Sequence, residues 1–287
     1  MRPTESPAVA RSIDSAAESG RGRVAVEQIA GDSFVTRLRA NSPLKLLSPH
    51  RRSHAAWVIA GSYGGGLVAG DHLRLDVRVG TGASLFIGTQ ASTKIYRSID
   101  GRSCGQELAV DAGAGAMCVI APDPVTPFSG AIYDQRQRID LAAGASLVLV
   151  DWLTAGRCAT GERWAFSRYA SRTNVFLAGR PVFRDALRLD ASDGSLASVC
   201  RTGGFDCFAT AVLIGEAVAA HAAALLQTLE RAPLRRGGPI LFAASPLASG
   251  LVLRAAGTGP EVVGRWLREQ LSLVAGLLGE DPWARKW

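Results

Sequence analysis

The sequence predicts a mainly β protein built from stacked strands, with two helices in its last third. Three observations predict this class. Apolar and polar residues alternate with period two from Leu73 to Val79, which is typical of a strand with one buried face. A strand–turn–strand pattern recurs along residues 77–147, within a β-rich region that spans 23–210. Segments rich in alanine and leucine, with helix signals at their ends, follow at about 215–231 and 260–278.

The composition indicates a globular chain. Of the 287 residues, 47% are hydrophobic and 20% are charged, so the chain can bury a sizeable core. This length allows one large domain or two ordinary ones. Residues 1–22 are rich in Ser, Ala, Glu, Arg and Pro and show no sustained period, so we expect them to form a flexible tail.

Charge and cysteine content narrow the class of protein. The formal net charge is +7, but the chain has no dense basic helix and no nucleic-acid motif, so we expect no nucleic-acid partner. A basic patch that contacts an acidic protein remains possible. The five cysteines are odd in number and widely spaced, which argues against a disulfide framework or a zinc site. Without a signal peptide or a membrane-length apolar run, we expect a cytoplasmic protein with no membrane partner.

The first strands can be placed in order along the chain. Residues 33–40 alternate and predict a strand, whereas 42–49 are bracketed by prolines and predict an edge strand or an extended loop. The apolar run 55–60 predicts a buried strand that leads into a glycine-rich segment. After the alternating strand, the turn at 80–82 is expected to reverse the chain, so that 84–87 returns as the next strand.

An internal repeat supports the stacked arrangement. Three similar strand–turn–strand units carry glycines at Gly82, Gly113 and Gly144, which gives steps of 31 residues (113 − 82 and 144 − 113). A fixed period of this size predicts stacked units that bury a shared face. A plain succession of hairpins is the alternative.

The last third has a different pattern. The segment 215–231 predicts a helix that ends before Pro233, and 239–256 predicts two strands around Ser245-Pro246. Pro260 suits the first turn of a second helix. A stripe of apolar residues at helical spacing predicts that this helix extends to Leu278.

The glycine-rich segment Gly61–His72 is the first candidate for a functional site. A phosphate-binding loop is excluded, because Gly70 is followed by Asp71 and His72 rather than by Lys and Ser or Thr. A dinucleotide fingerprint is excluded as well, since a strand follows where a helix is needed. The glycines are therefore expected to shape a tight β bend.

Catalytic and metal-binding patterns are weak. Neither G-x-S-x-G nor HExxH occurs. Carboxylates near the unusual loops are the candidates for metal ligands, with His72 beside them, although such residues are more often turn or cap residues. These candidates are Asp71, Asp123, Asp151 and Glu162. One hypothesis is therefore a β-rich hydrolase or ligand-binding protein with its site at the Gly61–His72 bend.

Several segments together resemble the UreD family of urease accessory proteins, called UreH in some organisms. The resemblance covers the chain from about Ser42 to the C-terminus, and the polar run Thr-Gln-Ala-Ser-Thr-Lys is its most specific part. The segments are Gly64–Asp71, with Gly64, Gly65, Gly66 and Gly70 as its structural signature, and Thr89–Arg97, Pro122–Phe128, Asp151–Arg157 and Gly161–Trp164.

The resemblance implies both a fold and a function. It implies one domain over residues 23–287, with a helical stack of strands in two sheets and a pair of helices. It also implies a non-catalytic scaffold that joins UreF and the GTPase UreG, docks on urease apoprotein and passes a transient nickel ion through an internal polar tunnel, without a permanent cofactor. The residues expected to line this path or to hold the metal are Asp71, His72, Gln90, Thr93, Lys94, Tyr96, Asp151 and Glu162.

Overall fold

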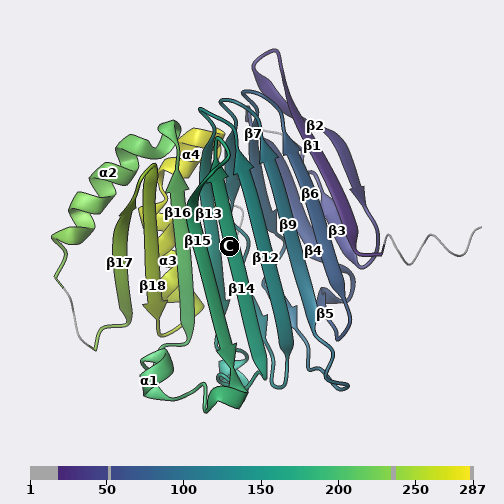
Figure 1. Ribbon diagram of the computed structural model, residues 1–287, viewed down its shortest axis with the longest axis vertical. Coiled ribbons are helices and arrows are strands. Elements are labelled where there is room, and N and C mark those ends of the chain that lie inside the picture. The colour runs from purple at the N-terminus through teal and green to yellow at the C-terminus, as the bar shows by residue number, and fades with distance from the viewer. Residues whose placement is uncertain (1–18, 51–52, 234–236, 285–287) are drawn as a thin grey trace, which may run out of the picture.

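The protein consists of two facing β-sheets with helices on one side (Figure 1). The computed structural model describes residues 19–50, 53–233 and 237–284. The seven-stranded sheet contains, in spatial order, β15 (Arg180–Asp190), β14 (Arg168–Leu177), β12 (Ile132–Leu141), β9 (Cys104–Ala112), β6 (His72–Val79), β1 (Arg21–Ile29) and β2 (Asp32–Ala40).

The second sheet has eleven strands. Its main path runs through β17 (Ile240–Leu247), β18 (Gly250–Gly257), β16 (Cys207–Ile214), β13 (Ser146–Thr154), β10 (Met117–Ile120), β7 (Ser84–Thr89), β4 (Ala56–Ser62) and β3 (Leu44–Leu47). A branch leaves the far end of β13 through β11 (Val125–Pro127), β8 (Thr93–Ile95) and β5 (Gly66–Leu67). The prediction of a mainly β fold with stacked strands in two sheets is confirmed.

The repeated units are coils that alternate between the sheets. β6 pairs in parallel with β1 and β9, whereas β7 pairs in parallel with β4 and β10 in the other sheet. The turn at 80–82 therefore carries the chain across the sandwich and does not form a hairpin. Stacking is thus confirmed, and the alternative of successive hairpins is wrong.

The register corrects the predicted spacing of the repeat. Val77 lies opposite Val110, and Val110 lies opposite Ile139. The equivalent turn glycines are Gly82, Gly115 and Gly144, all at positive φ, so the steps are 33 and 29 residues (115 − 82 and 144 − 115). The predicted repeat used Gly113 in place of Gly115, because Gly113 stands two positions earlier in the same turn.

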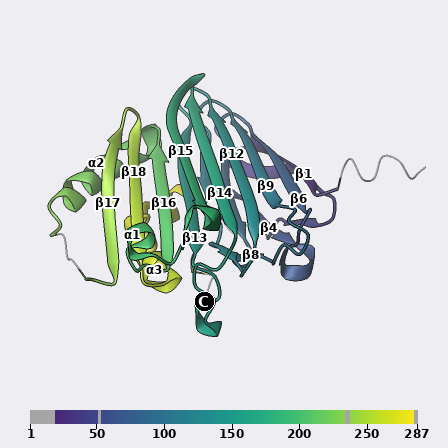
Figure 2. The ribbon, with the colours of Figure 1, turned by 60° about the horizontal axis from the view of Figure 1, so that its bottom comes forward.

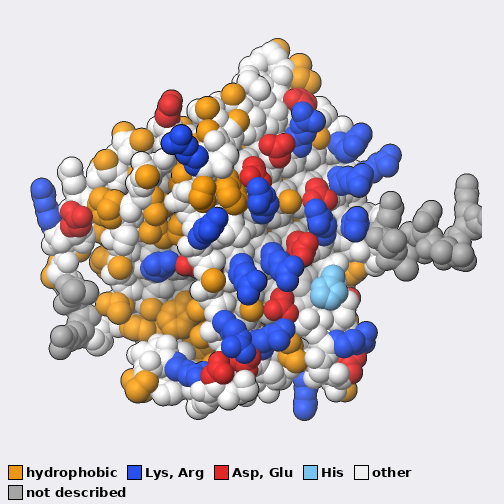
Figure 3. All heavy atoms as spheres, viewed as in Figure 1, with side chains coloured by type: hydrophobic (Ala, Val, Ile, Leu, Met, Phe, Trp, Pro, Cys, Tyr) orange, Lys and Arg blue, Asp and Glu red, His pale blue; other side chains and the backbone are white. Residues whose placement is uncertain are grey.

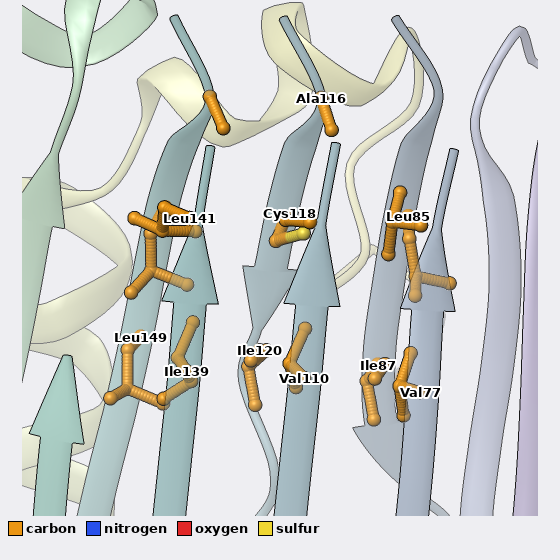
Figure 4. Packing of buried hydrophobic residues seen from close by; sticks show 14 of the residues in the cluster. Val77, Leu85, Ile87, Val110, Ala116, Cys118, Ile120, Ile139, Leu141 and Leu149 are labelled. Atoms are coloured by element: carbon orange, nitrogen blue, oxygen red, sulfur yellow. The ribbon is translucent and has the colours of Figure 1, made fainter. Parts of the chain in front are cut away.

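Apolar side chains fill the sandwich in two separate clusters. The first lies toward the turns that join the sheets, where Val77, Val110 and Ile139 line up on neighbouring strands and face the side chains of the other sheet (Figure 4). The second lies toward the opposite end and includes Leu67 and Ile95 from the short branch. The space between these two clusters is described below.

Helices cover the outer face of the eleven-stranded sheet, as two views show (Figures 1 and 2). The predicted helix at 215–231 is confirmed as α2 (Glu216–Glu230). The predicted second helix is interrupted at Leu271 and Ser272, and forms α3 (Pro260–Gln270) and α4 (Leu273–Leu278). The short elements are α1 (Val199–Thr202), η1 (Tyr63–Gly65), η2 (Cys158–Thr160) and η3 (Ala191–Asp193).

Most predicted strands are confirmed, with shifted boundaries. β2, β3 and β4 match the predictions at 33–40, 42–49 and 55–60, and β3 is an edge strand. β1 begins at Arg21, so the predicted tail of 1–22 is too long, and residues 1–18 lie outside the described residues. The last two strands turn at 248–249 rather than at Ser245-Pro246. Pro246 lies within the edge strand β17, where a missing N–H is tolerated.

The outer face of the seven-stranded sheet is open to solvent. No helix of the described residues packs on it, and exposed arginine and acidic side chains alternate across it (Figure 3). None of the helices described here is both long and apolar enough to cross a membrane.

A polar layer between the two sheets

A layer of polar side chains separates the two apolar clusters of the sandwich, and Asp151 of β13 lies at its centre. Gln135 Nε2 donates hydrogen bonds to both carboxylate oxygens of Asp151 at 3.0 Å. Gln137 Nε2 donates to Oδ2 at 3.2 Å, and Ser171 Oγ donates to the same oxygen at 3.0 Å. Three side chains of the seven-stranded sheet thus converge on one carboxylate of the other sheet.

Strand alternation places these donors inside. On β12 the inward positions are Tyr133, Gln135, Gln137 and Ile139, all buried, because every second residue of a strand faces the same side. Two glutamines therefore occupy consecutive inward positions of β12, in line with the apolar Leu73 and Leu75 two strands away on β6.

The parallel register extends the layer onto neighbouring strands. Gln135 lies opposite Ser171, and Gln137 lies opposite Thr173, to whose hydroxyl it donates at 3.3 Å. On the other side, the Tyr133 hydroxyl lies 2.9 Å from Gln106 Oε1 and 3.0 Å from Gln135 Oε1. Buried polar groups must be satisfied by such partners, so the layer forms one connected network.

The environment of Asp151 favours its neutral form. Burial raises the pKa of Asp151, and the charge of Asp185 raises it further, while the hydrogen bonds from Gln135, Ser171 and Gln137 act in the opposite direction. Burial also raises the pKa of Tyr133 well above its ordinary value, so its hydroxyl remains protonated. A cation that reached Asp151 would replace the amide donors as the partner of the carboxylate.

A cavity of about 110 Å³ lies beside Asp151, with room for several water molecules. Its apolar walls come from both clusters, for example Leu75 and Leu73. Its polar lining includes Thr89, Thr93, Gln106, Asp123, Gln135 and Gln137. The layer is therefore loosely packed, with open space of water size beside the carboxylate.

One end of the cavity lies close to the outer face of the eleven-stranded sheet. Thr89 Oγ1 donates to Asp123 Oδ2 at 3.0 Å and accepts from the Asp123 backbone N–H at 2.7 Å. Trp152 Nε1 donates to the Pro122 carbonyl at 2.8 Å. Pro122, Asp123 and Trp152 also line a groove beside α3, so the cavity and this groove share a wall.

An ion pair lies at the other end of the layer. Asp185 of β15 is opposite Thr173, and Arg254 of β18 is opposite Thr210, which is itself opposite Asp151. Arg254 and Asp185 meet across the two sheets at 2.7 Å. Their side chains are 56% and 31% exposed, so this pair lies at a solvent-accessible edge of the sandwich.

Two of the eight predicted site residues, Thr93 and Asp151, line the cavity. Gln90 is exposed and lines the groove beside α3. Lys94 is exposed as well, and Tyr96 is half-buried. The rings of Tyr96 and Phe128 are nearly perpendicular, with their centroids 5.3 Å apart.

The remaining predicted residues lie outside the layer. Asp71 accepts a hydrogen bond from the Val68 backbone N–H at 3.0 Å, and the neighbouring His72 is exposed. Glu162 pairs with Arg157 and accepts from the Ser129 backbone N–H. The hydrogen bond from Arg157 lowers the pKa of Glu162. The structure therefore places Asp71 and Glu162 in loops near the surface, and His72 at the exposed start of β6.

The signature glycines shape a bend for two physical reasons. Gly64, Gly65 and Gly70 have φ of +83°, +72° and +90°, which other residues adopt at a cost. Gly66 has an extended backbone, but a Cβ there would lie 2.6 Å from the Lys94 carbonyl oxygen. Glycine is therefore needed at positions 64, 65 and 70 because of their positive φ. At Gly66 it is needed because β5 approaches β8 closely.

A cysteine close to this bend is a poor candidate for a nucleophile. The nearby Cys104 is buried, and burial raises its pKa to about 12, so its thiol is a poor nucleophile. Among residues 19–50, 53–233 and 237–284, no group of three or more His, Cys, Asp or Glu side chains is arranged to hold a metal ion.

Sequence reasoning missed most members of the polar layer, namely Gln106, Gln135, Gln137, Ser171 and Thr173. A signal was present, since Gln135 and Gln137 share a strand face with Tyr133 and Ile139 in a clear alternation. Polar residues at two consecutive inward positions indicate a buried network.

These features define a class: a solenoid-like protein of two sheets with a polar layer and a cavity between two apolar cores. The family model of the UreD urease accessory protein matches residues 18–287. The chain is 48% identical to a urease accessory protein UreD of Sorangium cellulosum, covering 95% of this chain and 86% of that protein. It is 46% identical to a UreD of Anaeromyxobacter sp. (93% and 89%), and 33% identical to urease accessory protein D of Arabidopsis thaliana (92% and 99%). The chain belongs to the UreD family of urease accessory proteins.

Proposed function

We propose that this protein is a non-catalytic scaffold that relays nickel during maturation of the urease metallocentre. It acts with UreF and the GTPase UreG on urease apoprotein, in the cytoplasm and without nucleic-acid or membrane partners. Nickel is a transient cargo, and no permanent cofactor is required. Family membership supports the role in urease maturation.

The polar layer around Asp151 is the observation that supports a relay. Its ligand atoms are one carboxylate with amide and hydroxyl groups, and such oxygen donors hold nickel less firmly than clusters of imidazole or thiolate. Rotation of the Gln135 and Gln137 amides by half a turn brings their oxygens, instead of their N–H groups, toward a cation at Asp151. A weak and hydrated set of ligands suits an ion that must be passed on.

The layer also has a suitable position. It crosses the sandwich from the wall shared with the α3 groove to the Asp185–Arg254 edge. Each apolar cluster keeps the layer apart from the ends of the sandwich, so an ion within it is guided along one direction. The energy of GTP hydrolysis belongs to the partner UreG.

Co-purification tests this function most simply. The full chain is expressed with and without UreF, UreG and urease apoprotein, and nickel content and urease activity are measured on the same samples. We expect a stable complex and nickel-loaded urease only when this chain is present. A chain that stays alone, or active urease formed equally well without it, would refute the proposal.

A further inference from the structure

The open face of the seven-stranded sheet carries an ordered array of arginines. The register places outward residues of five or six strands in rows across the sheet. One row contains Arg172, Arg136, Glu107, Arg74 and Arg21 on consecutive strands. The adjacent row contains Arg184, Asn174, Arg138, Ala109, Asp76 and Arg23. These two rows, with seven arginines and two carboxylates, are called the basic band.

The band is accessible. The side chains of Arg74, Arg136 and Arg138 are 47%, 69% and 60% exposed. Figure 3 shows blue spheres of basic side chains running across this side of the molecule, with red acidic spheres between them. The outer face of the other sheet differs, because α2, α3 and α4 cover it.

Ion pairs within the sheet use only part of this positive charge. Arg74 lies 3.0 Å from Asp76 and 3.5 Å from Glu107, and Arg136 shares the same Glu107 at 3.5 Å. Arg138 pairs with Asp140 at 2.7 Å, just outside the band. Neither Arg172 nor Arg184 has an ion pair within the part of the chain that the structure describes. The band therefore keeps an excess of positive charge at the β14–β15 side.

Its geometry suits carboxylates presented by a folded surface. Neighbouring strands lie about 4.8 Å apart and alternate residues of one strand about 6.7 Å apart, so the backbone positions of the band form a grid with these spacings. Acidic residues one helical turn apart are separated by about 5–6 Å, which matches the grid. Guanidinium groups bind carboxylates through two parallel hydrogen bonds, and arginine is enriched at protein interfaces.

The composition of the band favours one kind of occupant. A second copy of the chain facing the band would bring its own excess of positive charge against it. A nucleic acid would bring phosphates against Glu107 and Asp76, which lie among the arginines. An acidic protein surface with a few basic residues can satisfy both signs of charge.

We propose that the basic band is the docking surface for an acidic face of a protein partner. The proposal depends on the charge pattern of the sheet and not on passage of nickel. It assigns a role to the uncovered side of the molecule, whereas the polar layer lies inside.

The test uses the full chain, the double variant Arg172→Glu/Arg184→Glu, and the control Arg265→Glu/Arg268→Glu. The control carries the same change of net charge on exposed arginines of α3. The probes are a fluorescent, glutamate-rich helical peptide and, separately, heparin. Dissociation constants are measured by fluorescence anisotropy at about 50 and about 300 mM salt, after the melting temperatures show that all three proteins fold.

We expect the band variant to bind the peptide about tenfold more weakly than wild type at low salt. The control should lose less than about twofold, and the difference should shrink at high salt. Equal losses in both variants would mean that the peptide senses only net charge, and would overturn the proposal. Loss of heparin binding with unchanged peptide binding would also overturn it, in favour of a nucleic-acid-like polyanion.

Discussion

Asp151 is held by side chains that donate hydrogen bonds, yet its pKa is raised. The burial penalty therefore outweighs the hydrogen bonds. Such a carboxylate weakens the folded state when it is ionised, which makes Asp151 a candidate functional group rather than a stabilising one.

The stability of the Asp151→Asn variant at different pH values tests whether burial outweighs the hydrogen bonds at Asp151. Because the folded-state pKa lies above the unfolded-state value, the folded protein binds more protons between the two values. The stability of wild type therefore falls as pH rises through that window. Asn has no such titration, so we expect the melting temperature of the variant, relative to wild type, to rise with pH. Each kcal/mol corresponds to about 2–4 °C in a chain of this size.

The measurement is a series of thermal melts between about pH 4 and pH 8. Rotation of the facing glutamine amides lets the Asn side chain keep its hydrogen bonds. If the difference in melting temperature between variant and wild type stays constant across this pH range, Asp151 does not titrate in the way proposed.

Individual site residues were only partly predictable. Asp151 and Thr93 were expected from the resemblance, and both line the cavity. Asp71 and Glu162 lie in similar signature segments but make local loop contacts. A motif indicates which segments matter, but the direction of each side chain depends on strand register, which one sequence does not show.

At the scale of elements, close approach between successive coils controls the turns. A Cβ on Gly113 would lie 2.9 Å from the Thr81 backbone nitrogen, whereas a Cβ on Gly276 of α4 would have nothing within 4 Å of it. The same substitution should therefore have opposite effects at these two glycines.

We expect Gly113→Ala to lower the free energy of unfolding by about 1–3 kcal/mol, because the stacked turns must move apart. Gly276→Ala should raise it by about 0.5–1 kcal/mol through helix propensity. The free energies of unfolding of both variants, measured by urea denaturation, check these two predictions. Destabilisation of similar size in both would argue against turn stacking as the cause.

Gly66 has a second, local prediction. A Cβ there meets the Lys94 carbonyl and the Tyr96 ring, so Gly66→Ala should loosen the pairing of β5 with β8. The Tyr96 backbone N–H donates to the Leu67 carbonyl at 2.9 Å, and we expect its hydrogen exchange to speed up by about tenfold or more, as local opening becomes easier. Gly276→Ala, where a Cβ meets open space and the backbone is not at positive φ, is the control. Unchanged exchange at Tyr96 would contradict this role of Gly66.

The elements themselves were largely predictable from periodicity. Alternation identified β6, and caps and apolar stripes identified α2 and α3. The sheet to which each strand belongs was not predictable, because a turn between two short strands looks similar whether it closes a hairpin or crosses a sandwich. The true repeat step was also hidden, since Gly113 and Gly115 both stand in one turn.

At the scale of the whole molecule, the sheets create two surfaces that no single segment contains. The polar layer needs β12 and β14 of one sheet to face β13 of the other. The basic band needs Arg21 to lie opposite Arg74, although more than fifty residues separate them in sequence. The resemblance implied the two-sheet stack, but only the observed register shows these alignments.

The central claim is that nickel reaches urease through the layer around Asp151. The most direct measurement is the nickel content of urease purified after co-expression with UreF, UreG and either wild type, Asp151→Asn or the exposed control Asp193→Asn. We expect all three chains to co-purify with their partners. Asp151→Asn should lower nickel loading by about tenfold, and the control should match wild type. Full nickel loading with Asp151→Asn, in a complex of normal composition, would contradict the account.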